Sequence, residues 1–465
     1  MQKLIAKYGL AAHLAILAVA PLFLFPFFDD GVSAVVTLWL SLPAFVWVFM
    51  QPSVRRGEML HDARQRVFSS VCKDSLFWVL VAAVAFCGLR ALNSGVALVY
   101  DAESLKWIIS APAFPLLPAS SGDAGFFPFA GSFACLVLVV GCRHALGRSA
   151  RQAYFLLSSA LAGTAAALAL FMANLGNAAA SDAMKCPYAS LSFVGVAFAV
   201  HCISGLVAVV SAVENKWNRV VPVLVLSAGF TAAGAFAFAP AYVSGIFLVA
   251  WVAVFGYAFF YAFYVLRCAS EFKLLILVSV SILSGWVLVS MTAPGSFIAS
   301  RAAAFADRVF FADWYESAQS AVTALSLKAW MASPWTGTGV GSFGLDIRFN
   351  ATPADWAAIP RGMAASPLGW MLLITERGIA GAAMMALPLV LMTVTYVVRF
   401  VGWLFSRRAP RPGCWTAPAV VLAVVATGFF DCSYLRVDVL MAVSAVLALS
   451  PSAFPKKAAK GEKDG

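Results

Sequence analysis

The chain has 465 residues, of which 62% are hydrophobic and only 11% are charged, and its mean hydropathy is +0.88. This composition excludes a water-soluble globular protein and indicates a polytopic membrane protein. The apolar runs are far longer than barrel strands, and a helix satisfies its backbone amides internally in lipid, so helical spans are expected.

In chain order, hydropathy predicts an all-α transmembrane bundle of about twelve helices, each about 20 residues long. Nine helices fall in residues 1–293, namely 10–28, 32–50, 76–99, 126–146, 153–172, 191–213, 220–239, 242–266 and 274–292. A large extracytoplasmic loop, expected to be periplasmic and partly helical, covers 294–366 between helices 9 and 10. Three more helices follow in 367–455, near 368–400, 417–430 and 437–449, before a basic tail at 456–465.

Lysine and arginine positions support this topology, because the cytoplasmic loops of membrane proteins are enriched in both. With the N-terminus inside, 22 of the 32 basic residues fall on the cytoplasmic side, whereas Asp29, Asp30, Asp101 and Glu103 fall outside. The sequence therefore predicts a multi-pass protein of the bacterial inner membrane with both termini cytoplasmic. Anionic lipid headgroups account for the net charge of +11, and no nucleic-acid partner is expected.

The long loop between helices 9 and 10 is the first place to expect function, since loops of that length in compact proteins are usually functional. No Gly or Pro occurs between Gly295 and Pro334, which predicts an external helix or helical pair. Its charged residues include Arg308, Asp313 and Glu316. An amphipathic helix resting on lipid headgroups would explain many of these charges equally well.

A glycine-rich stretch, SPWTGTGVGSFG, ends this helical part of the loop. Gly337, Gly339 and Gly341 would let the backbone approach a ligand and present amides to an anion. Neither a strand nor a nucleotide-binding fold surrounds the pattern, so on glycine spacing alone a plain turn is the better interpretation.

The whole arrangement resembles the family of O-antigen ligases and polymerases. Arg308 with Trp314 resembles the family's arginine before an aromatic helix, and Pro334, Gly337, Gly339 and Phe343 match its Pro-x-x-Gly-x-Gly-x-x-x-Phe pattern. Glu376 and Gly378 match its Glu-x-Gly on the next membrane helix. The motif matches are confined to about the last third of the chain.

The resemblance implies a transferase that moves a glycan from undecaprenyl pyrophosphate to a glycolipid or glycan acceptor at the periplasmic face. The lipid pyrophosphate is already an activated leaving group, so neither a metal nor another cofactor is expected. Glu376 and Arg308 are the catalytic candidates. The substrate-binding candidates are Arg348, Arg361, Trp314 and the three glycines named above. The two arginines are included because arginine forks hold phosphates and stabilise developing charge.

Two departures from the family pattern keep other interpretations open. Ser366 and Pro367 occupy the place of the family histidine, and the outer turn at 239–245 carries no arginine. Without the histidine, the base would have to be Glu376, Asp313 or Glu316. Alternatively, Glu376 forms an ion pair with Arg377 or with Arg90 of another helix. A catalytically degraded glycolipid-binding relative and a transporter or flippase remain alternatives.

Overall fold

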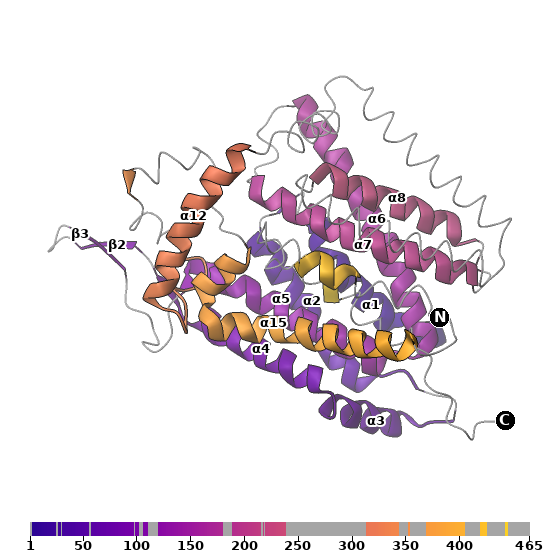
Figure 1. Cartoon of the computed structure of the whole chain (residues 1–465). Coiled ribbons are helices and arrows are strands. Elements are labelled where there is room, and N and C mark those ends of the chain that lie inside the picture. The colour runs from indigo at the N-terminus through magenta and orange to yellow at the C-terminus, as the bar shows by residue number, and fades with distance from the viewer. Residues whose placement is uncertain are drawn as a thin grey trace.

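The protein is described here from a computed structural model. The backbone is described for residues 2–24, 27–28, 30–54, 57–96, 98–101, 106–109, 120–179, 188–214, 217, 219–238, 313–343, 352–353, 369–404, 419–425 and 442–444. In these parts the chain is overwhelmingly helical (Figure 1).

The first half of the chain forms a series of helices, most of them apolar. They are α1 (Gln2–Leu24), α2 (Asp30–Met50), α3 (Leu60–Cys72), α4 (Ser75–Leu92), α5 (Phe126–Val140), the π-helical turn η2 (Gly141–Ala145), α6 (Arg148–Ala179), α7 (Tyr188–Glu214) and α8 (Val221–Phe238). The later described helices are α12 (Asp313–Ala332) and α15 (Gly369–Leu404).

Five of these helices are long and apolar enough to cross a membrane. The crossing segments are Gly31–Met50, Ser75–Leu92, Phe126–Ala145, Ser149–Met172 and Trp370–Pro388, and shorter apolar stretches occur in α1, α7 and α8. These spans confirm a helical membrane protein. The predicted helices at 242–266 and 274–292 lie outside the described residues, and those at 417–430 and 437–449 are described only at 419–425 and 442–444. The count of twelve helices therefore stays a prediction.

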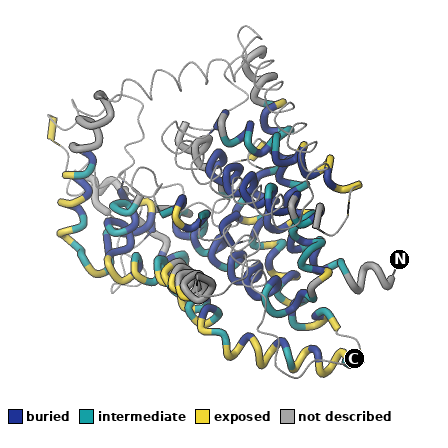
Figure 2. The backbone as a smooth tube through the Cα atoms, turned by 45° about the vertical axis from the view of Figure 1, so that its right-hand side comes forward, coloured by how far each residue is buried: buried dark blue, intermediate teal, exposed yellow. Residues whose placement is uncertain are grey.

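Helix α2 shows how the bundle is arranged for lipid. Its buried face carries small or polar residues such as Ala34, Thr37, Ser41 and Ala44, whereas its exposed face carries large apolar ones such as Trp39. Small residues let membrane helices approach closely, and large apolar residues suit contact with lipid tails. The burial pattern in Figure 2, with buried residues toward the middle and exposed ones along the edges, therefore matches a membrane-embedded bundle.

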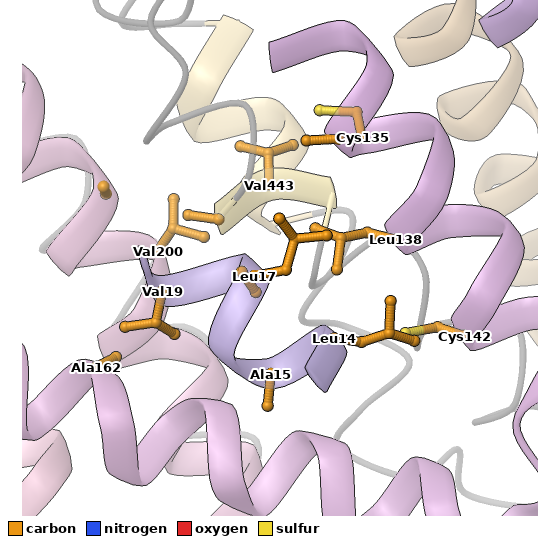
Figure 3. Packing of buried hydrophobic residues seen from close by; sticks show 14 of the residues in the cluster. Leu14, Ala15, Leu17, Val19, Cys135, Leu138, Cys142, Ala162, Val200 and Val443 are labelled. Atoms are coloured by element: carbon orange, nitrogen blue, oxygen red, sulfur yellow. The ribbon is translucent and has the colours of Figure 1, made fainter. Parts of the chain in front are cut away.

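The centre of the bundle is a single apolar cluster around α1. Leu14 and Leu17 of α1 lie near Leu138 and Cys142 of the α5–η2 segment, and Val19 faces α6 at Ala162 (Figure 3). Helices α6 and α8 also approach closely, because a Cβ added at Gly163 would lie 2.4 Å from Ser227 Cα. This core holds the helices whose ends carry the polar groups described below.

Two features of the chain differ from the sequence-based expectations. The third predicted helix, 76–99, ends at Leu92 with Asn93 as its C-cap, and short strands follow at β1 (Ser94–Val96) and β2 (Leu98–Asp101). Strand β1 pairs with β4 (Ser120–Ser121), and β2 pairs antiparallel with β3 (Lys106–Ile109). The prediction was wrong here because apolar residues of the strands continued the hydropathy of the helix.

Helix α3 was not predicted. It is amphipathic, with Ala63, Val67 and Val71 buried at four-residue spacing while Phe68 and its polar neighbours are exposed. Arg66 pairs with Glu58 at 2.8 Å and donates to the Ser53 carbonyl at 2.9 Å, which ties this helix to the preceding turn. Helix α3 therefore covers the end of the bundle from which α4 starts.

Candidate functional site

The glycine-rich stretch forms a compact loop directly after α12, defined here as the glycine loop, residues 333–343. Its entry is a tight turn, in which the Ser333 amide donates to the Trp330 carbonyl at 3.0 Å and the Gly337 amide to the Ser333 carbonyl at 2.8 Å. The Trp330 indole donates to the Pro334 carbonyl at 3.2 Å. Val322, Leu325 and Phe343 form a small apolar cluster against Leu372, which seats the loop between α12 and α15.

Helix α15 is interrupted where the loop meets it. Gly378 has φ 66° and ψ −179°, which no helical residue adopts. In an unbroken helix the amides of residues 379 and 380 would donate to the carbonyls of 375 and 376. Here the Ile379 amide donates to the Pro334 carbonyl at 2.9 Å and the Ala380 amide to the Trp335 carbonyl at 3.2 Å.

The glycine loop also satisfies the carbonyls that the break leaves behind. The Thr338 amide donates to the Thr375 carbonyl at 2.8 Å, and the Gly339 amide donates to the Glu376 carbonyl at 3.0 Å. The loop is thus inserted into the hydrogen-bond ladder of α15. It provides acceptors for the two amides and donors for the two carbonyls that would otherwise bond to each other within the helix. Irregular backbone at membrane depth is tolerated only where protein or water satisfies it, and this loop supplies the partners.

Two glycines make this close contact possible. A Cβ at Gly337 would lie 2.4 Å from the Glu376 carbonyl carbon, and a Cβ at Gly378 would lie 2.2 Å from the Trp335 carbonyl oxygen. Both residues also have positive φ, at 72° and 66°, where other residues are strained. These glycines therefore allow the backbone of the glycine loop to approach the backbone of α15, a role that was not predicted from the sequence.

Glu376 is held at the junction by its side chain as well as its backbone. Its carboxylate Oε1 accepts a hydrogen bond from the Gly341 amide at 2.9 Å, and the residue is buried. Since the amides of Gly337, Gly339 and Gly341 all donate to protein acceptors, they orient the site internally. Their predicted contact with substrate stays a prediction.

A buried arginine of α4 completes this side of the junction. Arg90 is 2% exposed, its Nη2 donates to the carbonyl of Thr336, and its guanidinium carbon lies 5.4 Å from the centre of the Phe86 ring. It lies within electrostatic range of both Glu376 and Arg377. The sequence offered Arg90 as a partner of Glu376, and the structure adds the glycine loop as its hydrogen-bond acceptor.

Arg377 is the second buried arginine at the junction. It is 2% exposed, and its Nη1 contacts the thioether sulfur of Met385. Its Nε is buried and has no hydrogen-bond partner among the residues that the structure describes. A thioether is a weak acceptor, so within the described parts of the chain most of the donor capacity of this guanidinium is unused.

The positions of the other predicted site residues or of their side chains are not described by the structure. Arg308, Arg348 and Arg361 lie outside the described residues, together with Ser366, Pro367 and the 239–245 turn. Trp314, Asp313 and Glu316 belong to the first turn of α12, but their side chains are not described. Of the predicted site residues, the structure therefore joins Glu376 to the three glycines.

A second polar cluster lies at the opposite end of α4. Asp74 caps the helix by accepting from the Leu76 amide at 3.1 Å, and its Oδ2 lies 2.9 Å from His144 Nε2 and 3.2 Å from Arg143 Nε. The other ring nitrogen of His144, Nδ1, lies 2.7 Å from Ser70 Oγ. This cluster joins α3, α4 and η2 and was not found from the sequence.

The charge of Asp74 is stabilised by these neighbours. Burial raises its pKa, but the His144 hydrogen bond, the charge of Arg143 and the Leu76 amide outweigh burial, so the pKa lies below the ordinary 3.8. The N-terminal end of α4 therefore carries an ionised carboxylate with identified partners.

No family model matches this chain, and no curated protein matches it either.

Proposed function

We propose that the protein is an inner-membrane glycosyltransferase that moves a glycan from undecaprenyl pyrophosphate to an acceptor, either a lipid A core or a growing polysaccharide, at the periplasmic face. One observation carries the proposal. The two motifs of the resemblance, Pro334 to Phe343 and Glu376 with Gly378, form a single unit in which the Glu376 carboxylate accepts from the Gly341 amide at 2.9 Å. Motifs placed together in this way support a shared role in one site.

The reaction would break the bond between the sugar C1 and the pyrophosphate oxygen. An acceptor hydroxyl oxygen would form the new bond to C1 and lose its proton to a base, and the lipid pyrophosphate would leave with the electron pair of the broken bond. Glu376 is the base candidate at this junction. A carboxylate offers about four acceptor positions, so the bond from Gly341 orients the group without using up its capacity.

Buried arginines beside this carboxylate suit the leaving group. Arg90 and Arg377 are each 2% exposed and come from helices that cross the membrane. Guanidinium groups stabilise the charge that develops on a departing phosphate, and they do so more strongly where water is excluded. The arrangement supports donor activation by electrostatics and needs no metal for that step.

Ligation and polymerisation use the same donor and differ in the acceptor, so the proposal covers both. A glycolipid-binding relative without turnover is the second candidate, and the observation that favours it is the absence of a histidine at 366 or 367. The two candidates differ in whether Glu376 has to accept a proton.

The test is complementation of a gene deletion in the host, with surface glycan examined by gel electrophoresis. Wild type and Glu376→Gln are compared with Glu58→Gln, whose carboxylate pairs with Arg66 away from the junction. We expect wild type and Glu58→Gln to restore long glycan and Glu376→Gln to fail, with all three proteins present in the membrane at similar levels. Full restoration by Glu376→Gln would exclude Glu376 as the base, and glycan unchanged by the deletion would contradict the proposed function.

A further inference from the structure

We infer that Arg377 and Arg90 form an anion site inside the membrane region that takes the phosphate group of a phosphate-bearing ligand. The inference deepens the proposed function and rests on it in identifying that ligand as the polyprenyl-linked phosphate of the donor. The cations expected from the family resemblance were Arg308, Arg348 and Arg361 of the long loop. The site inferred here instead uses membrane helices α4 and α15.

The first argument is the local balance of charge. Two guanidinium groups, of Arg90 and Arg377, lie within electrostatic range of each other, and Glu376 is the acid near them among the described side chains. Among the described side chains, two guanidinium groups therefore lie beside one carboxylate. Burying guanidinium groups away from water is costly, and an anion that binds both of them would offset part of that cost.

The second argument is the unused donor on Arg377. Its Nε is buried, has no hydrogen-bond partner in the described parts of the chain, and belongs to a residue that is 2% exposed. Buried polar atoms are nearly always paired in folded proteins, so an orphan donor needs an explanation. A phosphate oxygen would accept from it, because Arg and phosphate form short, charge-assisted hydrogen bonds.

The third argument is the way Arg377 is packed. A Cβ at Gly381 would lie 2.7 Å from Arg377 Cβ and 2.8 Å from Phe86 Cζ, so glycine at 381 allows the two side chains to approach. The Phe86 ring also contacts the Arg90 guanidinium. With Met385 at Nη1 of Arg377, apolar groups border the two guanidinium groups. Such surroundings suit an amphiphile with a phosphate head and a hydrocarbon chain.

The experiment measures the thermal unfolding temperature of the full chain in phosphatidylcholine nanodiscs. The probes are undecaprenyl phosphate, inorganic pyrophosphate, and sulfate at matched ionic strength. Wild type is compared with Arg377→Met, Arg377→Lys and Arg90→Met. Arg64→Met is the control, because Arg64 is exposed on α3 and donates to the Met50 carbonyl, away from the junction.

We expect undecaprenyl phosphate to raise the unfolding temperature of wild type and Arg64→Met. Arg377→Met should bind this lipid at least about tenfold more weakly, and Arg377→Lys should fall between, because lysine keeps the charge but loses the fork. Without ligand, Arg377→Met should unfold no earlier than wild type, since it removes an uncompensated charge. Arg90→Met should both lose the lipid response and unfold earlier, because the Thr336 carbonyl loses its donor.

The outcomes separate this inference from the proposed function. A response to pyrophosphate equal to that of the lipid, lost in Arg377→Met, supports the anion site and assigns it to soluble phosphate. An unchanged lipid response in Arg377→Met, a response to sulfate of equal size, or earlier unfolding of ligand-free Arg377→Met overturns the inference. Lipid binding that depends on Arg377, without any glycan loss in the deletion strain, would leave the site standing and contradict the transferase.

Discussion

Charged groups lie at both ends of helix α4, but their hydrogen-bond partners differ between the two ends. At the N-terminal end, Asp74 is paired with His144 and Arg143 and also caps the helix. At the C-terminal end, Arg90 meets a backbone carbonyl of the glycine loop, and the adjoining Arg377 keeps an unpaired nitrogen. These ends are separated by the length of the helix, with α3 near one and α12 near the other (Figure 1).

The difference distinguishes a structural cluster from a binding site. Around Asp74, the polar groups are hydrogen-bonded or paired with one another, so their interactions stabilise the fold and leave little for a ligand. At the junction, the buried Nε of Arg377 has no hydrogen-bond partner among the described residues, and this leaves a cost of burial that a ligand can relieve. Residues tuned for function often reduce stability in this way. The following predictions test each end of α4 in turn.

The largest effect is expected at the broken helix. Gly378→Ala would place a Cβ 2.2 Å from the Trp335 carbonyl oxygen at a φ of 66°, and neither backbone can move without losing the shared hydrogen bonds. We expect a loss of about 3 kcal/mol or more of unfolding free energy, or failure to accumulate in the membrane. The measurement is folded yield followed by thermal unfolding in detergent.

Gly229→Ala is the matched control for that substitution. A Cβ at Gly229 of α8 meets no atom within 4 Å, so this variant should unfold at or slightly above the wild-type temperature. Wild-type stability in Gly378→Ala would show that the loop is not inserted into α15 as described.

An intermediate effect is expected at the Asp74 end. Asn is as good an N-cap as Asp, so Asp74→Asn isolates the charge interactions with His144 and Arg143. We expect a loss of about 1–3 kcal/mol at neutral pH. Because the folded pKa of Asp74 is lowered, the stabilisation is fully present above its ordinary 3.8 and is lost as pH falls through the folded value.

The pH profile of thermal unfolding checks this prediction. The difference between wild type and Asp74→Asn should shrink as pH falls below 3.8 toward the lowered pKa of Asp74 in the folded protein. Asp62→Asn serves as control, because Asp62 is exposed in the first turn of α3 and should give a small difference. A difference that grows as pH falls below 3.8 would contradict the lowered pKa of Asp74.

The smallest effect is expected for Ser70→Ala. The Ser70 hydroxyl is exposed and pairs with His144 Nδ1, so water can replace it. A loss of about 0.5 kcal/mol is expected, measured as a small shift in unfolding temperature. A double variant with Asp74→Asn should lose roughly the sum of both effects if Ser70 contributes only to the position of α3. A loss several times larger for Ser70→Ala would show that the hydroxyl is central to the cluster.

Much of the helical architecture could be predicted because the membrane imposes a simple rule. Long apolar runs near 32–50, 126–146 and 153–172 coincide with the spans that the structure describes. Helix α3 was missed because its buried face consists of only Ala63, Val67 and Val71, spaced four apart within a polar segment. That spacing is a helical signal which a search for apolar runs does not detect.

The site could be predicted only in part. The resemblance brought Glu376 and the glycines together, and their hydrogen bond agrees with that grouping. The inserted ladder, the break at Gly378 and the contact of Arg90 with Thr336 depend on partners far apart in the chain, which local spacing does not specify. The Asp74 cluster was missed for the same reason, since His144 is 70 residues away.

The insertion of the glycine loop into α15 has a mechanical consequence. A bare glycine break would act as a hinge between the two halves of a helix. Here the glycine loop forms hydrogen bonds with the Ile379 and Ala380 amides and with the Thr375 and Glu376 carbonyls. Bending at Gly378 would therefore have to break these bonds or move the loop together with the helix. Any displacement of the first part of α15 should therefore move the glycine loop and the end of α12 with it, and a movement of α12 should reach Glu376 through the same hydrogen bonds.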